Sequence, residues 1–202
     1  MTKPLAAVRA HLRSHFAGAG ADSEPDTASV TFLGAEPIEV LRFSSGVDGV
    51  VHYVSVGCSR HPMTDPADIE ADPLRGPRAE VVLRLRDPGR ITGVPRSLAV
   101  LAATPAVEGV VLTADALIDL SGPLWSDRAG PAPFTAVLLS PSDIPDLPLQ
   151  PPRDPVRFLC ATPITATEAA WVRLKGADAM RQAWRTDGVD VLNPNRPAAQ
   201  PD

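Results

Sequence analysis

The stretch VHYVSVGCSRHPM, Val51 to Met63, holds two histidines, a tyrosine, a cysteine and a glycine within thirteen residues. Its first half alternates in polarity, so that Val54 and Val56 lie on one side and Tyr53 and Ser55 on the other. A period of two residues is typical of a strand in a sheet. The preceding SGVDG ends in Asp-Gly, which favours a hairpin turn. We therefore predict a strand here, followed by CSRHPM as the loop that leaves it.

Three more apolar segments resemble strands: AEVVLRLR (79–86), FTAVLLS (134–140) and VRFLCAT (156–162). In the first of them the alternation predicts Val81 and Leu83 facing inward and Glu80 facing outward. Strands and helices follow one another without a regular βαβ rhythm. The pattern predicts an α+β fold, an α/β sandwich in which helices cover a mixed, largely antiparallel sheet.

Apolar residues at helical spacing predict the helices of this fold. One helix is expected over residues 4–17 and another over 95–107, where Pro105 is expected to end the helix early. Thr165 followed by Glu168 fits a capping box, which opens a helix that carries Trp171. A last helix carries Trp184 and ends near residue 188.

The length of 202 residues suits one substantial domain, which we expect over residues 1–192. The segment PSDIPDLPLQPPRDP, residues 141–155, has too many prolines for a helix or a central strand and is predicted to be a long loop. Residues 193–202 are polar and rich in proline, and we expect them to form a flexible tail.

Charge and hydropathy patterns exclude several classes of function. The net charge is −5 and the arginines are scattered, so a nucleic-acid partner is not expected. No run of about 20 apolar residues predicts a membrane span, and charged residues interrupt the N-terminal segment where a signal peptide would need an apolar core. With only two cysteines, Cys58 and Cys160, we expect a cytoplasmic protein with free thiols.

Cys58 and His61 have a C-x-x-H spacing that could supply two zinc ligands or a nucleophile with its base. His52 cannot easily join them, because six residues of strand span about 20 Å. Neither residue lies in a known catalytic motif, and further ligands would have to come from far along the chain. We therefore expect no metal, no cofactor and no catalytic residues; an enzyme or metal-binding protein that uses Cys58 and His61 is the alternative.

In order along the chain, VHYVSVGCS, AEVVLRL, FTAVLLS and FLCATPITATEAAWVRLKGADAM resemble the motifs of the suppressor of fused (SUFU) family. The resemblance is to the stand-alone bacterial type and covers roughly residues 31–191. It implies a sheet-and-helix sandwich without enzymatic activity. The animal member restrains a transcription factor by clamping an extended peptide between two domains, and some bacterial members are similar to immunity proteins of toxin systems.

The family's peptide contacts imply a role for Tyr53 and for an acidic residue in the following loop, which matches Asp65. Arg60 and His61 lie where the predicted strand leaves the sheet, and loops on a rigid scaffold commonly carry recognition. We therefore expect Tyr53, Arg60, His61 and Asp65 to bind a partner protein, either a toxin or a regulatory protein, which this chain sequesters or neutralises. Tyr53 itself is either covered by a helix or available to the partner.

Overall fold

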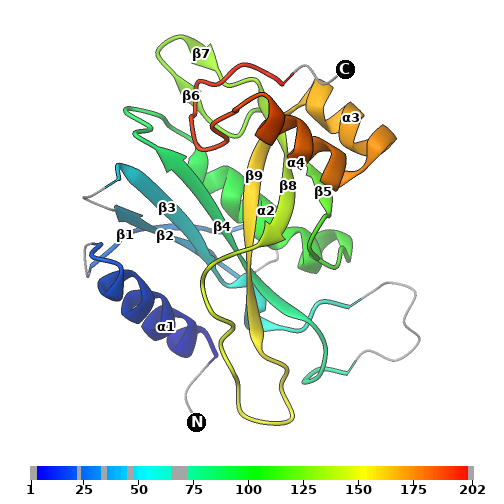
Figure 1. Cartoon of the computed structure of the whole chain (residues 1–202). Helices are drawn as coiled ribbons and strands as arrows, with labels where there is room; N and C mark the ends of the chain where they lie inside the picture. Colours follow the sequence, from blue (N-terminus) through cyan, green and yellow to red (C-terminus); the bar gives the residue numbers. More distant parts are fainter. Residues whose placement is uncertain (1–3, 22–23, 33–35, 45–47, 65–71, 200–202) are drawn as a thin grey trace.

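A computed structural model describes residues 4–21, 24–32, 36–44, 48–64 and 72–199 of the chain. Within these residues, seven strands form one sheet in the order β1-β2-β3-β4-β9-β8-β5 (Figure 1). The strands are β1 (Asp26–Val30), β2 (Ile38–Ser44), β3 (Val50–Val56), β4 (Arg78–Arg86), β5 (Leu117–Asp119), β8 (Phe134–Pro141) and β9 (Val156–Thr165). All neighbours are antiparallel except β4 and β9, which run parallel. The predicted α+β fold with a mixed, largely antiparallel sheet is confirmed.

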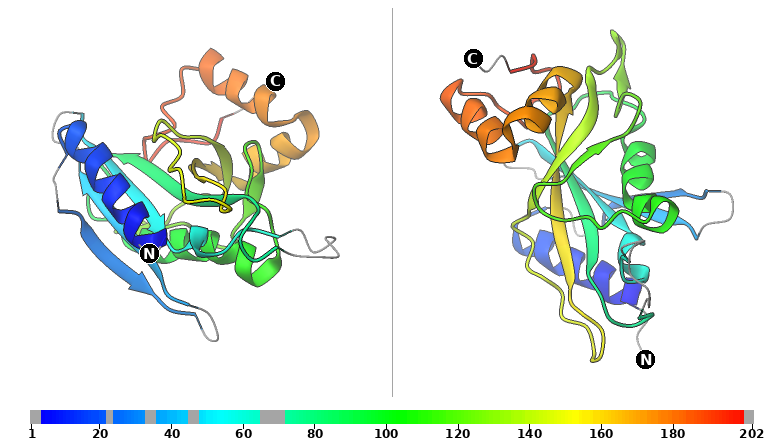
Figure 2. Two further views of the ribbon diagram at one scale, coloured as in Figure 1. Left: turned by 90° about the horizontal axis from the view of Figure 1, so that it is seen from below. Right: turned by 90° about the vertical axis from the view of Figure 1, so that its right-hand side faces the viewer.

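Helices cover both faces of this sheet, as Figures 1 and 2 show. Helix α1 (Pro4–Gly18) lies on one face, and α3 (Ala166–Lys175) and α4 (Ala177–Thr186) pack beside the other half of that face. Helix α2 (Val94–Glu108) covers the opposite face. Smaller elements complete the described fold: a turn of 3-10 helix, η1 (Cys58–Arg60), and the hairpin of β6 (Ser126–Asp127) and β7 (Gly130–Pro131).

Strand β3, the strand predicted from the opening stretch, is buried on both sides. Val51 and Tyr53 belong to the core beneath α2, whereas Val54 and Val56 belong to the core beneath α1. The alternation therefore places the strand correctly, and the more polar side of the strand is covered as well. When helices cover both faces of a sheet, both sides of each central strand are buried.

Helix α2 does not end early at Pro105, contrary to the expectation from sequence, but continues to Glu108. A proline at this position leaves the carbonyl of Leu101 without its helical N–H donor. The Thr104 hydroxyl donates to that carbonyl at 2.8 Å and so replaces the missing hydrogen bond. Helix α3 begins at the predicted capping box, with the Thr165 hydroxyl accepting from the Glu168 N–H and the Glu168 carboxylate accepting from the Thr165 N–H.

Residues 142–155 form a loop that lacks regular helix or sheet apart from one bridge between Leu147 and Val156, as the prolines predict. The described part of the expected tail, residues 193–199, packs against the domain. Arg196 and Ala199 are buried there, next to β9 and the first turn of α3. The physical reason is a buried carboxylate at Glu168, which requires a positive partner.

Candidate functional site

The loop that follows β3 is organised by a buried carboxylate that sequence analysis placed on the outside. Glu80 on β4 has no exposed surface, and its carboxylate accepts from the N–H of Gly57 at 2.9 Å and from the N–H and hydroxyl of Ser59 at 3.1 and 2.6 Å. The Ser55 hydroxyl donates to its other oxygen. Burial raises the pKa of Glu80, while these hydrogen bonds act in the opposite direction. The turn from β3 into η1 is therefore wrapped around Glu80.

Gly57 and Arg78 complete the support of this turn. Gly57 has a φ of 146°, and a Cβ there would lie 3.0 Å from the Ile38 side chain, so the turn favours glycine. The Arg78 guanidinium, which is buried, donates to the carbonyls of Ser59, Arg60 and Leu74. The backbone on which Arg60 and His61 stand is thus held from two sides.

The side chains of Arg60 and His61 both turn toward Glu36, just ahead of β2. Arg60 donates to the Glu36 carboxylate at 2.8 Å and to the carbonyl of Pro37 at 2.9 Å. The Nε2 atom of His61 lies 3.2 Å from the same carboxylate. The hydrogen bond with His61 and the charge of Arg60 hold the pKa of Glu36 below its usual value. Two of the four residues expected in the site therefore lie together at the surface.

These residues form one wall of a hollow of about 280 Å³, the α2 C-terminal hollow. Ile38, Cys58, Arg60 and His61 line it on the sheet side, and the wall from α2 consists of Ala102, Ala103, Pro105, Ala106 and Val107. Small side chains on α2 leave this space open. The hollow is apolar inside and charged at its rim.

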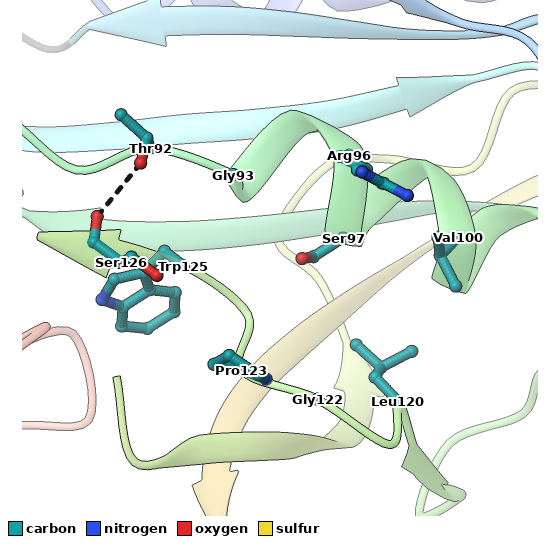
Figure 3. A pocket seen from close by; sticks show the side chains of 10 residues that line it. All are labelled: Thr92, Gly93, Arg96, Ser97, Val100, Leu120, Gly122, Pro123, Trp125 and Ser126. Atoms are coloured by element: carbon teal, nitrogen blue, oxygen red, sulfur yellow. Dashed lines mark hydrogen bonds between the residues drawn. The ribbon is translucent and has the colours of Figure 1, made fainter. Parts of the chain in front are cut away.

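A second hollow of about 330 Å³, the α2 N-terminal hollow, lies at the other end of the same helix (Figure 3). Arg96, Ser97 and Val100 come from α2, and Leu120, Pro123 and Trp125 come from the segment opposite. Although glycine and proline flank Trp125 in the sequence, only 3% of this residue is exposed, and its ring packs against Phe134. Mutual hydrogen bonds between the main chains of Thr92 and Ser126 close the far end of the hollow.

A line of residues on α2 connects the two hollows. Arg96, Val100, Ala103 and Val107 follow one another at helical spacing, so they share one face of the helix. Val100 borders the N-terminal hollow, and Ala103 and Val107 border the C-terminal one. Val100 is 36% exposed and Val107 is 66% exposed. This line and both hollows are called the α2 surface below.

The other two residues of the expected site lie elsewhere. Tyr53 is 6% exposed and packs in the core beneath α2, the covered alternative of the two that the sequence left open. Asp65 lies outside the described residues. The α2 surface itself was missed, because Val100 and Val107 lie among alanines and leucines in a predicted helix and do not stand out there as exposed residues.

The geometry around Cys58 and His61 does not favour nucleophilic chemistry. Cys58 is buried, and burial together with the nearby Glu80 carboxylate raises the pKa of its thiol well above the usual value. His61 pairs with Glu36 instead. No group of three or more potential metal ligands gathers in the part of the chain that the structure describes. Among the same residues, no helix has the length and apolar character needed to cross a membrane.

One mixed seven-stranded sheet, with helices on both faces and a Glu80-centred turn after β3, defines an α+β sandwich domain. The chain belongs to the suppressor of fused protein (SUFU) family, whose model matches residues 34–197. This match confirms the resemblance carried by the strand and helix motifs. No curated protein sequence matches the chain significantly.

Solved structures that share the fold include the following three. A SUFU homologue from Neisseria gonorrhoeae matches with a TM-score of 0.63 and 19% identity, over 96% of this chain and 95% of its own. A chain of the Sufu-Fu complex matches with a TM-score of 0.67 and 16% identity, over 96% and 91%. Drosophila Suppressor of Fused matches with a TM-score of 0.66 and 16% identity, and 98% of this chain spans 51% of that chain.

Proposed function

We propose that this chain is a protein-binding module that sequesters or neutralises a partner protein without catalysing a reaction. The observation that carries the proposal is the α2 surface, where each of two exposed valines borders a hollow along one helix. Exposed apolar side chains beside concave surface are typical of protein-protein interaction sites. Membership of the SUFU family supports the proposal, since one structure of similar fold is a complex of Sufu with Fu.

The function can take two forms that share this surface. Covering a toxin would make the chain an immunity protein, and covering a regulatory protein would make it a repressor of that protein's activity. Both forms place the chain in the cytoplasm. The free, buried thiols of Cys58 and Cys160 support a reducing compartment.

The alternative is an enzyme or metal protein that uses Cys58 and His61. It requires a thiolate that a partner or metal can reach, whereas this thiol is buried and its pKa is raised. Binding of about one equivalent of zinc per chain, abolished by Cys58→Ala or by His61→Ala, would restore that alternative.

Affinity capture with a matched control tests the proposed function. The tagged full-length chain is incubated with cytoplasmic extract of the organism that encodes it, in parallel with V100Q/V107Q and with L174Q. Leu174 on α3 is 75% exposed and far from both hollows, so it controls for general loss of surface hydrophobicity. We expect a protein that wild type and L174Q retain and that V100Q/V107Q loses.

The captured protein is then purified and titrated by calorimetry. Val100 and Val107 together expose about as much surface as one free valine side chain. Burying that surface is worth about 1.5 kcal/mol or more, so the double variant should bind at least tenfold more weakly. If no retained protein depends on Val100 and Val107, while both variants remain folded, the proposed function is wrong for this surface.

A further inference from the structure

From the charges and spacing of the α2 surface, we infer that its partner is an acidic protein segment with two apolar side chains about 10 Å apart. This inference rests on the proposed function and adds to it the chemistry of the partner. The inference follows from three features of the surface: the distance between its apolar positions, the volume of its hollows and the sign of the charge around them.

The distance comes from helix geometry. Val100 and Val107 are seven residues apart on α2, and seven residues of α-helix rise by about 10 Å. The same distance separates residues about three apart in an extended segment, or seven apart in a second helix. Each valine borders one hollow, so each apolar side chain of the partner has a valine and a cavity to fill.

The hollows limit the size of these side chains. Volumes of about 280 and 330 Å³ accept a large side chain such as leucine, methionine or phenylalanine. Between them stands Ala103, which is almost fully buried and presents only a methyl group. A partner backbone can therefore approach α2 closely between its two apolar residues.

The charges at the N-terminal end of the surface favour an acidic partner. Arg96 lines the N-terminal hollow. Arg60 lines the C-terminal hollow but is already paired with Glu36. Arg90, Asp127 and Arg128 line a shallow depression next to the Thr92–Ser126 link.

At the N-terminal end of this surface and in the depression beside it, cations therefore exceed acids in a chain whose net charge is −5. At the C-terminal hollow, Glu108 follows Val107 and adds a second acid to Glu36. Complementary charge at such a rim speeds association and selects the partner more than it adds affinity.

A peptide library tests the inference without knowledge of the natural partner. Random 12-residue peptides are displayed and selected on the purified full-length chain. We expect enriched peptides to carry aspartate or glutamate and two large apolar residues, spaced either three or seven apart. A synthetic consensus peptide should bind V100Q/V107Q at least tenfold more weakly than wild type, bind L174Q unchanged, and lose affinity as salt rises.

Charge reversal makes the test sharper. Arg96→Glu should weaken the consensus peptide, and a peptide with lysine in place of its acidic residues should recover affinity for that variant. Enriched peptides that are basic, that lack the apolar pair, or that bind the α2 variants as well as wild type would overturn the inference. A library that yields no enriched peptide would also overturn it, while the capture experiment decides the binding function separately.

Discussion

Glu80 belongs to β4, and its side chain reaches the turn that leads from β3 into η1. Its buried carboxylate holds that turn through hydrogen bonds from three residues. The alternation along β4 places this side chain opposite Val81 and Leu83, which suggested solvent. Solvent is absent there because the turn of Ser55, Gly57 and Ser59 folds over it. A buried carboxylate requires hydrogen-bond donors, and Ser55 at the end of β3 supplies them together with Gly57 and Ser59.

Replacing Glu80 by alanine should therefore destabilise the protein strongly. Removing the carboxylate leaves two main-chain N–H groups buried without an acceptor, each of which costs about 1–3 kcal/mol. We expect Glu80→Ala to lower the free energy of unfolding by about 3 kcal/mol or more, measured by urea denaturation. Glu80→Gln keeps one acceptor oxygen and should cost less. A loss below about 1 kcal/mol in Glu80→Ala would show that the turn does not depend on the carboxylate.

At the scale of elements, α1 is held to the sheet by both apolar and polar contacts. Phe16 stacks on Phe43 of β2 with 4.1 Å between ring centroids, and Arg9 forms a two-point ion pair with Glu39. His52 of β3 meets the edge of Phe16. Burial, followed by the positive charge of Arg84, lowers the pKa of His52 below its usual value of 6.5.

This pKa shift predicts that acid weakens the domain around α1. His15 adds to the lowering, while Asp143 and Asp48 oppose it. Because the folded protein binds this proton less tightly than the unfolded chain, stability is highest above pH 6.5 and falls as the pH drops through the lowered pKa. Urea denaturation at pH 7.5 and 5.5 should show the loss, and His52→Phe should reduce it. An equal loss in wild type and His52→Phe would assign the acid sensitivity to other groups.

The C-terminal segment is tied to α3 by a buried ion pair. The Arg196 guanidinium donates to both oxygens of Glu168, at 2.7 and 3.0 Å, and to the carbonyl of Pro163. The indole N–H of Trp184 on α4 donates to the same carboxylate at 3.0 Å. Burial opposes ionisation, but these hydrogen bonds together hold the pKa of Glu168 below its usual value. One carboxylate thus joins a helix cap, a neighbouring helix and the end of the domain.

Removing Arg196 should leave this carboxylate buried and uncompensated. Breaking one side of a buried ion pair costs about 3–5 kcal/mol. We expect Arg196→Met, and equally a chain that ends at residue 192, to lose stability of this size in thermal or urea unfolding. Arg185→Met on the exposed side of α4 is the matched control. If truncation at residue 192 left stability unchanged, the segment would be the free tail that its composition predicted.

At the scale of the whole molecule, the sheet consists of two antiparallel halves that meet at one parallel pair. Strands β1 to β4 form one half, strands β5, β8 and β9 form the other, and β4 and β9 join them. The core beneath α2 includes residues from both halves, such as Val81 and Val137. Because the halves share a core, we expect them to unfold together.

The two thiols report on this cooperativity. Cys58 follows β3 in one half, Cys160 lies on β9 in the other, and both are buried. Burial also raises the pKa of both thiols, so neither is reactive in the folded protein. With a thiol reagent and increasing urea, we expect two groups per chain to react over one common transition. Reaction of one thiol well before the other would show that the halves unfold separately.

Local patterns in the sequence were enough to predict strands β3, β4, β8 and β9, the helices and the fold class. Each of these patterns depends on residues that are close together in the sequence. Examples are the period of two in β3 and β4, the helical spacing before Phe16 and the capping box at Thr165. The order of these motifs was also enough to identify the SUFU family. Each of these signals is contained in a short stretch of chain, which is why a single sequence reveals it.

Only the tertiary structure decided which polar groups are buried and where the surface is apolar. Glu80 meets a turn more than twenty residues away, and Arg196 meets a carboxylate 28 residues away. Tyr53 is covered because α2 closes the second face of the sheet, which its own alternation does not specify. The α2 surface exists because a loop after β3 and a segment before β8 end beside the same helix. The burial of a residue depends on which distant parts of the chain pack against it, and local periodicity does not reveal those contacts.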